Sequence, residues 1–210
     1  SPLSNFETQL DNSYRVRTDP AVTVGFEIAD GQGDLSGAKL LIWTTTPWTL
    51  PSNLAIAASA ETEYAVMTAK DGERYILAEA ALEKYKKQFE NARQVATVTG
   101  ASLKGLKYHP PFDYFPGHQN AFQVLIEDFV TSEGGTGFVH LAPGFGEDDL
   151  TACRKADIAV VVPVDQAGLY TAEISDYEGM LVFDANKPII QRLKLEGKLF
   201  RHDTYDHDYP

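Results

Sequence analysis

The stretch that decides the organisation of this chain runs from residue 42 to residue 53 and reads Ile42-Trp43-Thr44-Thr45-Thr46-Pro47-Trp48-Thr49-Leu50-Pro51-Ser52-Asn53. It begins as a buried strand and then changes character. A core strand has no reason to end in three consecutive threonines, because each buried hydroxyl must find a hydrogen-bond partner. The two prolines stiffen the exit and cannot continue a sheet ladder. The stretch therefore predicts a rigid shelf of hydroxyl groups beside an apolar wall, which suits a small polar ligand.

A second stretch points to the same kind of site, and it reads Gly134-Gly135-Thr136-Gly137-Phe138-Val139-His140-Leu141-Ala142-Pro143-Gly144-Phe145-Gly146-Glu147-Asp148-Asp149. A glycine-rich turn leads into a short strand that carries His140, and the strand breaks at a Pro-Gly pair. An acid-rich helix start follows, where carboxylates complement the helix macrodipole. Asp149 comes nine residues after His140 across a turn, so the spacing predicts that both side chains can face one cavity.

The length and composition are those of a chain with a real core. The 210 residues, 43% of them hydrophobic, suffice for one large domain or two small ones. No internal repeat or low-complexity linker divides them, so we expect a single domain over residues 1–210. No apolar run reaches membrane length and the first residues lack a signal peptide, which predicts a cytoplasmic protein without a membrane partner. The absence of an initiator methionine suggests a piece excised from a longer protein.

Charge and cysteine content exclude several classes of function. The net charge of −12 argues against a stand-alone nucleic-acid binder, although it leaves open contact with one nucleotide end. Cys153 is the single cysteine, which excludes an internal disulfide and a cysteine-based zinc site. Its place in a predicted helix favours a packing role over a catalytic thiol.

Hydrophobic periodicity predicts a mixed α/β, β-dominated fold with a β-barrel-like core and peripheral helices. Strands are predicted at residues 21–28, 39–44, 54–57, 64–69, 74–77, 95–99, 122–130, 137–141 and 158–164. The last of these is rich in β-branched residues and is expected to be buried. Helices are predicted at residues 78–89, 147–156 and 184–196, with Asp184 as the N-cap of the third helix and Gly197 as its stop.

The two stretches together resemble the editing domain (connective peptide 1) inserted in class I aminoacyl-tRNA synthetases for branched aliphatic amino acids, and most closely the isoleucyl member. Residues 43–53 match the pattern Trp-Thr-Thr-Thr-Pro-Trp-Thr-Leu-Pro-x-Asn, and residues 135–149 match Gly-Thr-Gly-x-Val-His-x-Ala-Pro-Gly-x-Gly-x-x-Asp. Valyl and leucyl relatives usually carry arginine where this chain has Thr46, which favours the isoleucyl type. The resemblance covers essentially the whole chain, including the flanks at residues 2–7 and 207–210.

This resemblance implies that the domain edits valine wrongly attached to tRNA(Ile), after the amino acid has been transferred to the tRNA. Editing before that transfer is left open. One missing methylene is worth only about 1–3 kcal/mol in an apolar pocket, a limit for which this synthetase family is the standard example. A second pocket then admits valine and excludes isoleucine. The implied partners are the valine-carrying 3′-terminal adenosine of tRNA(Ile) and the remaining domains of the parent synthetase. No cofactor is expected in this domain, since ATP is used by the catalytic domain, whose signatures these residues lack.

The resemblance also assigns roles to individual residues. Asp149 is expected to bind the substrate's α-ammonium, His140 to form the pocket wall that excludes isoleucine, and the threonines to hold the substrate or the attacking water. The expected catalytic residues are Thr44, Thr46, His140 and Asp149. The expected substrate-binding residues are Thr45, Trp48, Thr49, Asn53, Gly137 and Phe138, together with His140 and Asp149.

The residues by themselves leave alternatives open for several of these positions. Asp149 can be an ordinary acid at a helix N-terminus, and His140 can be a strand histidine that faces solvent. Thr45 points to the opposite face from its neighbours if the strand is regular. Trp48 is better explained by packing, and Asn53 either caps the turn or touches the terminal ribose.

Three alternatives concern the chemistry. No Ser-His-Asp constellation is present, so a positioned water is favoured over a covalent acyl-enzyme. A non-catalytic module that only binds the tRNA 3′ end remains the main alternative. A metal-dependent hydrolase could use the His/Asp run at residues 202–208, but the run lacks zinc-motif spacing and no metal is expected. Finally, Lys84, Lys86 and Lys87 form either a solvated helix face or a contact with the tRNA acceptor.

Overall fold

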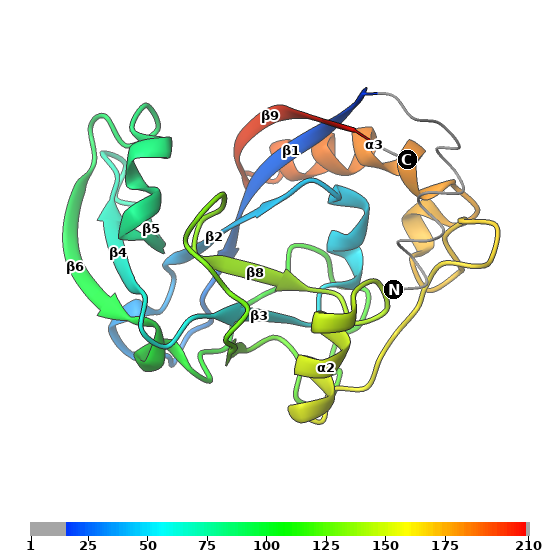
Figure 1. Cartoon of the computed structure of the whole chain (residues 1–210), viewed down its shortest axis with the longest axis horizontal. Coiled ribbons are helices and arrows are strands. Elements are labelled where there is room, and N and C mark those ends of the chain that lie inside the picture. The colour runs from blue at the N-terminus through cyan, green and yellow to red at the C-terminus, as the bar shows by residue number, and fades with distance from the viewer. Residues whose placement is uncertain (1–15, 209–210) are drawn as a thin grey trace.

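The computed structural model of this protein describes residues 16–208, of which residues 16–18 and 205–208 are described by their backbone alone. Two sheets organise this part of the chain (Figure 1). The larger has the strand order β6-β4-β5-β2-β1-β9, with bounds β1 Val16–Glu27, β2 Lys39–Thr44, β4 Glu63–Thr68, β5 Arg74–Ala78, β6 Arg93–Thr99 and β9 Leu199–Asp208. The smaller has the order β7-β3-β8, with bounds β3 Ala55–Ala58, β7 Val124–Ile126 and β8 Phe138–Leu141.

Helices are few and lie at the periphery of the sheets (Figure 1). The α-helices described are α2 (Glu147–Lys155) and α3 (Val182–Leu195). The 3₁₀ helices described are η1 (Gly33–Leu35), η2 (Pro47–Ser52), η3 (Glu79–Tyr85), η4 (Gly100–Leu103) and η5 (Ser175–Tyr177). None of the helices in the described part of the chain is long and apolar enough to cross a membrane.

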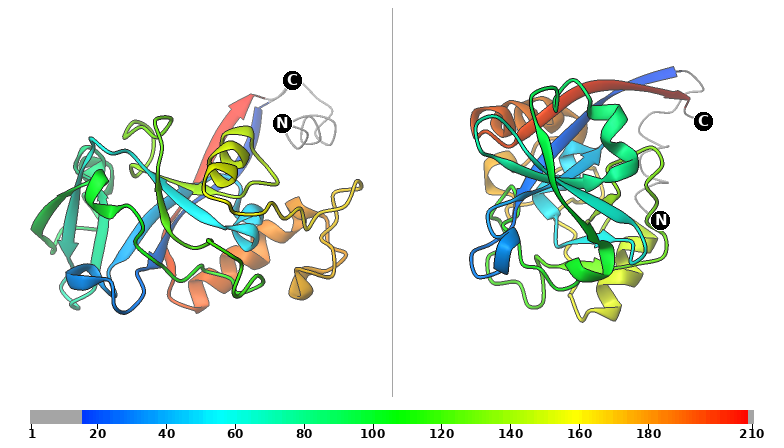
Figure 2. Two further views of the ribbon diagram at one scale, coloured as in Figure 1. Left: turned by 90° about the horizontal axis from the view of Figure 1, so that it is seen from below. Right: turned by 90° about the vertical axis from the view of Figure 1, so that its left-hand side faces the viewer.

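Strands β1 and β9 form a long antiparallel ribbon (Figure 2). Strand β1 also pairs with β2, which joins the ribbon to the rest of the larger sheet. Residues Ala21 to Phe26 of β1 are all buried, and successive side chains point to opposite faces, so every second one packs on the side of the main core. The buried set on this face includes Val22, Val24 and Phe26, all with 0% exposure. The register places Val22 opposite Thr44, so the last residue of β2 lies over the main core.

Strand β3 separates two hydrophobic cores. Its four residues are all buried, and they alternate between the two sides as the two-residue period of a strand requires. Ile56 and Ala58 face the main core, which β1, β2, β4, β5 and α3 share, while Ala55 and Ala57 face a smaller core closed by α2. A strand covered on both faces holds its neighbour β8 in a fixed position, and β8 carries His140.

The predicted fold class is confirmed, since the described chain is sheet-dominated with few helices. The two sheets stay separate in this part of the chain and do not close into a barrel. The strand predicted at residues 39–44 is found with the same bounds. The strand predicted at 137–141 is β8 and the helix predicted at 147–156 is α2, each within one residue of the predicted limits.

Four local predictions are wrong. Residues 158–164 form no named strand, and Val160 and Val162 are 45% and 53% exposed; only an isolated bridge joins Val164 to a residue further on. Strand propensity reflects packing on a pleated surface, and this segment joins no ladder with a described strand that would provide one. The expected strand at 122–130 shrinks to β7, and the helix expected at 78–89 is the 3₁₀ helix η3. Helix α3 begins after Leu181, so Asp184 lies in its first turn and is not its cap.

Candidate active site

A cavity of about 730 Å³ opens where β2, β8 and the start of α2 meet. The end of β2 and η2 supply the threonines, β8 supplies the histidine, and the first turn of α2 supplies a carboxylate. A loop before β8 and one residue of η3 complete the wall. The lining residues are Trp43, Thr44, Thr45, Thr46, Thr49, Lys84, Phe129, Thr131, Glu133, Gly134, Gly135, Phe138, Val139, His140, Ala142, Phe145 and Asp149.

The turn after β2 brings the threonine hydroxyls together. Thr46 is the N-cap of η2, and Thr49 lies three residues later. Side chains at positions i and i+3 eclipse one another in a 3₁₀ helix, which places the Oγ1 atoms of Thr46 and Thr49 at 3.2 Å. Thr44 joins them at the other end, with its Oγ1 at 3.2 Å from that of Thr46. The predicted hydroxyl shelf is therefore present and faces the cavity.

The direction of each hydrogen bond in the shelf follows from the fixed donors and acceptors around it. Thr49 donates its hydroxyl proton to the carbonyl oxygen of Thr46 at 2.8 Å. In its contact with the Thr46 hydroxyl, the Thr49 oxygen must therefore be the acceptor. Thr46 accordingly donates to Thr49 and accepts from Thr44. The Thr44 oxygen also accepts the backbone N–H of Thr46 at 3.1 Å. A hydroxyl has one proton and two lone pairs, so Thr44 and Thr46 each keep one lone pair for a ligand.

His140 is held by hydrogen bonds at both ring nitrogens. The Nδ2 of Asn53 lies 2.9 Å from the carbonyl oxygen of Ala55, which can only accept, and 2.8 Å from His140 Nδ1. The orientation of the Asn53 amide is thereby assigned, and Tyr108 donates its hydroxyl to the amide oxygen at 2.5 Å. His140 Nδ1 must accept from Nδ2, so the neutral ring carries its proton on Nε2.

The contact between His140 and Thr49 supports the same tautomer independently. Their atoms Nε2 and Oγ1 are 2.9 Å apart. Because the Thr49 proton is already donated elsewhere, this contact requires a proton on Nε2. Burial lowers the pKa of His140 from 6.5 to about 4, so the ring is neutral near pH 7. Both nitrogens are therefore occupied within the protein, and the ring acts as a fixed wall and a donor, not as a base toward the cavity.

Asp149 supplies the carboxylate of the site. It is half-buried in the first turn of α2, and its Oδ2 accepts the backbone N–H of Ala142 at 2.9 Å. Gly146 makes room for it, because a Cβ there would come within 2.9 Å of the carboxylate. Burial raises the pKa of Asp149, and the backbone hydrogen bonds oppose that rise. The neighbouring acids Glu147 and Asp148 are exposed, so Asp149 alone of the three lines the cavity.

The structure brings most of the expected site residues to this cavity. Those that line it are Thr44, Thr45, Thr46, Thr49, Phe138, His140 and Asp149. Thr45 is among them because β2 ends at Thr44, and strand alternation does not apply beyond that point. Phe138 lies 4% exposed and stacks on Tyr64 with ring centroids 4.5 Å apart.

Three expected substrate-binding residues lie behind the wall instead. Trp48 is 1% exposed and packs edge-on against Phe145 at 5.2 Å between centroids, so it belongs to the core. Asn53 contacts His140 from the far side of the ring. Gly137 has φ +88, and a Cβ there would lie 2.5 Å from Ala78, which explains the glycine by packing.

Several lining residues were not expected from the sequence. The loop from Phe129 to Gly135 closes one side of the cavity, and Trp43, Lys84 and Phe145 line others. The glycine pair at 134–135 was the only local signal of this loop. Lys84 comes from η3, far away in sequence, and its place became visible only in three dimensions.

A metal centre was not expected, and the described part of the chain contains no group of three or more His, Cys, Asp or Glu residues placed to hold an ion. The His/Asp run of the metal hypothesis is described only at its beginning. Asp203 there pairs with Arg201 at 2.6 Å, and His202 is exposed. The side chains of 205–208 lie outside the described residues, as do the flanking motif segments 2–7 and 209–210.

Comparison with solved structures defines the class of fold. The CP1 domain GlLeuRS-CP1 superposes with a TM-score of 0.70 at 14% identity, covering 87% of this chain and 98% of that one. The editing domain of the P. falciparum cytosolic leucyl-tRNA synthetase superposes with a TM-score of 0.65 at 11% identity, covering 88% and 99%. No protein-family model matches the chain. The fold is thus that of an aminoacyl-tRNA synthetase editing domain.

Comparison of sequences finds relatives of one type. Isoleucine–tRNA ligases match over 100% of this chain, with 51% identity for Nocardia farcinica, 48% for Corynebacterium diphtheriae and 49% for Mycobacterium tuberculosis H37Rv. The chain spans about a fifth, 21%, of the length of each of these relatives. Over its whole length the chain is therefore similar to one part of the isoleucine–tRNA ligases, and the resemblance of its two motif stretches is confirmed.

Proposed function

We propose that this domain hydrolyses the ester that links valine to tRNA(Ile) and spares the isoleucyl ester. The observation that carries the proposal is the convergence of the threonine shelf, His140 and Asp149 on one cavity. Its volume lies in the range of small-molecule sites and suits an aminoacyl-adenosine. The partners required are the 3′ end of the charged tRNA and the remaining domains of a larger synthetase in the cytoplasm.

The Asp149 carboxylate anchors the α-ammonium of the amino acid. The backbone N–H of Ala142 fixes its Oδ2, and a carboxylate with about four acceptor sites keeps capacity for a ligand. A charge-assisted hydrogen bond in a half-buried position is stronger than one in water and fixes the orientation of the substrate. The bound ammonium also favours the ionised form of Asp149 and so offsets the effect of burial on its pKa.

Thr44 and Thr46 position the attacking water. Each has one unused lone pair, and their oxygens are 3.2 Å apart, so together they accept both protons of one water molecule. The water oxygen then directs a lone pair at the ester carbonyl carbon. A new C–O bond forms, the ester C–O bond breaks, and a proton passes to the departing ribose oxygen, with the neighbouring ribose hydroxyl as a candidate relay. This domain needs no cofactor or metal for these steps, and ATP serves the catalytic domain of the parent synthetase.

Discrimination between valine and isoleucine is assigned to the rigidity of the wall. His140 is locked at both nitrogens and Phe138 is stacked on its neighbour, so neither side chain yields easily to an extra methylene. Inserting one methylene into a well-packed site typically costs 1–3 kcal/mol. The editing pocket therefore rejects isoleucine because its extra methylene overlaps with the wall. The synthetic site cannot reject valine well, because valine only lacks the contacts of one methylene there.

The decisive experiment compares release of valine and isoleucine from tRNA(Ile) by this chain and by two variants. Asp149→Asn removes the anchor, while Asp148→Asn changes an exposed acid of the same helical turn and is the matched control. Valine is expected to be released faster than isoleucine, and Asp149→Asn to abolish that release while Asp148→Asn retains it. Binding of valyl-adenosine without any hydrolysis would indicate a binding module instead.

A further inference from the structure

Three hollows that share lining residues lead from the candidate site across the molecule, and their linings carry several cations beside a few acids. The site cavity shares Lys84 with a second hollow between η3 and β9, which is lined by Glu83, Lys84, Lys86, Lys87, Gln88, Arg201, His202 and Asp203. This second hollow shares Arg201 and His202 with a third hollow of about 840 Å³ between α3 and the β1–β9 ribbon. We call the set Lys84, Lys86, Lys87, Arg201, Lys187 and Lys194 the basic track.

The charge of the basic track is unusual for this chain, whose net charge is −12. Two of its six cations are neutralised by ion pairs, Lys86 with Glu83 at 3.1 Å and Arg201 with Asp203 at 2.6 Å. Within the described part of the chain, the other exposed lysines of the track form no ion pair. Burial lowers the pKa of Lys84, and the positive charge of nearby Arg201 lowers it further, as expected where cations lie close together.

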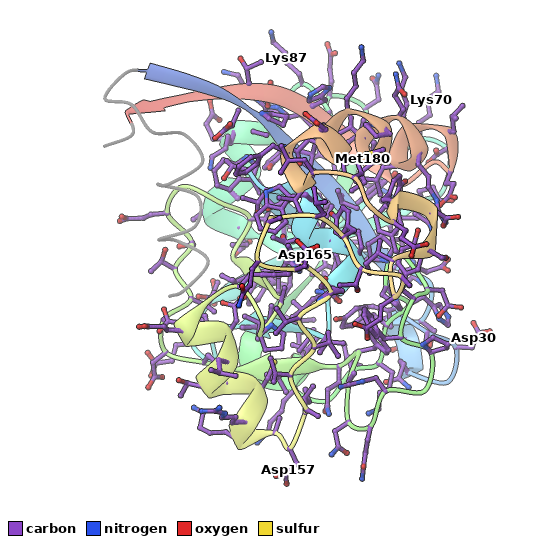
Figure 3. All side chains as sticks on the ribbon, turned by 90° about the vertical axis from the view of Figure 1, so that its right-hand side faces the viewer. Asp30, Lys70, Lys87, Asp157, Asp165 and Met180 are labelled. Carbon is purple, nitrogen blue, oxygen red and sulfur yellow. The ribbon has the colours of Figure 1, made fainter. Side chains whose placement is uncertain are left out.

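The track is built on firmly connected elements. Arg201 donates to the backbone carbonyl of Lys84 at 2.6 Å, and its guanidinium lies 5.2 Å from the ring centroid of Tyr85. The Tyr85 hydroxyl in turn meets Thr23 of β1 at 2.7 Å. These contacts hold η3 against β9 and β1, so the backbone that carries Lys84 is fixed next to Arg201. Lys87 projects outward at the edge of the molecule beyond β9 (Figure 3).

The third hollow adds an apolar floor to the track. Phe183, Ile190, Leu199 and Phe200 line it together with the cations Lys187, Lys194 and Arg201 and one acid, Asp19. A positive groove combined with aromatic side chains is the arrangement by which proteins bind single-stranded nucleic acid, because cations follow the phosphates and rings stack on bases. The hollow lies at the end of the track away from the site.

From this arrangement we infer that the basic track binds the phosphodiester backbone of the single-stranded 3′ end of the RNA whose terminal residue enters the site. The inference rests on the proposed function and adds to it the path of the strand. A polyanion approaching a domain of net charge −12 is repelled over most of the surface, and the track supplies the local positive potential that guides it to the cavity. The third hollow takes an unstacked base of the same strand.

The test separates phosphate binding from chemistry by using two substrates. Val-tRNA(Ile) carries the backbone, and valyl-adenosine carries no phosphodiester. The track variant combines Lys87→Gln, Lys187→Gln and Lys194→Gln, none of which lines the site cavity. The control combines Lys104→Gln, Lys107→Gln and Arg154→Gln, which are exposed and line none of the three hollows.

The track variant is expected to raise KM for Val-tRNA(Ile) roughly tenfold at low salt, and to reduce the salt slope of log Kd for the uncharged tRNA by about 2, since each lost contact to a single strand removes about 0.7. Hydrolysis of valyl-adenosine is expected to stay unchanged, and the control variant to match the parent chain. An unchanged KM and salt slope in the track variant would overturn the inference, as would an equal loss on both substrates. If the parent chain hydrolyses neither substrate, the proposed function fails, and the salt slope of tRNA binding still decides whether the track binds RNA.

Discussion

Acidification is expected to destabilise this domain through His140, because its ring is held neutral in the folded state. Burial lowers the pKa of His140 from 6.5 to about 4, and the Asn53 amide that faces Nδ1 is a donor, so a second ring proton has no acceptor there. The unfolded chain takes up that proton at higher pH than the folded chain does. The stability that His140 contributes is therefore fully present above pH 6.5 and is lost as the pH falls toward 4.

The magnitude follows from the two pKa values, 6.5 and about 4. A gap of about 2.5 in pKa, at about 1.36 kcal/mol for each unit, corresponds to about 3 kcal/mol in the acid limit. Between pH 7.5 and pH 5.5 the loss is about 1.3 kcal/mol, because only part of the proton uptake by the unfolded state occurs in that interval.

Urea unfolding at a series of pH values measures this contribution. His140→Gln keeps an acceptor for Asn53 and a donor for Thr49 but cannot titrate, and His109→Gln removes an exposed histidine as the control. The parent chain should lose about 1.3 kcal/mol more than His140→Gln between pH 7.5 and 5.5, and His109→Gln should follow the parent. Parallel pH profiles for the parent and His140→Gln would refute the reasoning, since carboxylate titration is common to both.

Three further predictions test single contacts. Asn53→Asp replaces the donor at Nδ1 with an acceptor, so ¹⁵N NMR should show the His140 proton on Nε2 in the parent and on Nδ1 in the variant; a parent ring protonated at Nδ1 would contradict the assigned tautomer. Gly100→Ala places a Cβ 1.7 Å from a backbone carbonyl oxygen and should cost about 2 kcal/mol or more in urea unfolding, whereas Gly135→Ala, with no atom within 4 Å, should cost less than about 1 kcal/mol. Cys153 has 0% exposure and a pKa raised by burial to about 12, so a thiol reagent should label it only as fast as the fold opens; rapid labelling of the folded chain would exclude this burial.

Local chemistry made part of the fold and of the site predictable. The strand at residues 39–44 was predicted with its observed bounds, because apolar residues followed by hydroxyls and a proline define both the strand and its end. The short strand with His140 and the helix that starts at the acids were recognisable in the same way. Such signals act over a few residues, and that is the range over which turn, cap and strand preferences operate.

Pairing partners were beyond the reach of the same reasoning. Residues 158–164 have the composition of a buried strand, yet they join no ladder with a described strand, and Val160 and Val162 are largely exposed. The 3₁₀ helix η3 has helical spacing, but its geometry is set by packing against β5 and by Arg201 from the far end of the chain. Propensity is a weak guide where a distant segment decides the hydrogen bonds.

The sequence by itself determined which chemical groups this protein brings to its site: three threonine hydroxyls, one imidazole and one carboxylate, each at the end of a recognisable local element. Only the tertiary structure decided what those groups can do. His140 lies 87 residues from Asn53 and 91 from Thr49, and Tyr108 lies 55 residues from Asn53. These distant partners set the tautomer of the ring, because a hydrogen bond depends on which atoms meet in space and not on their order along the chain.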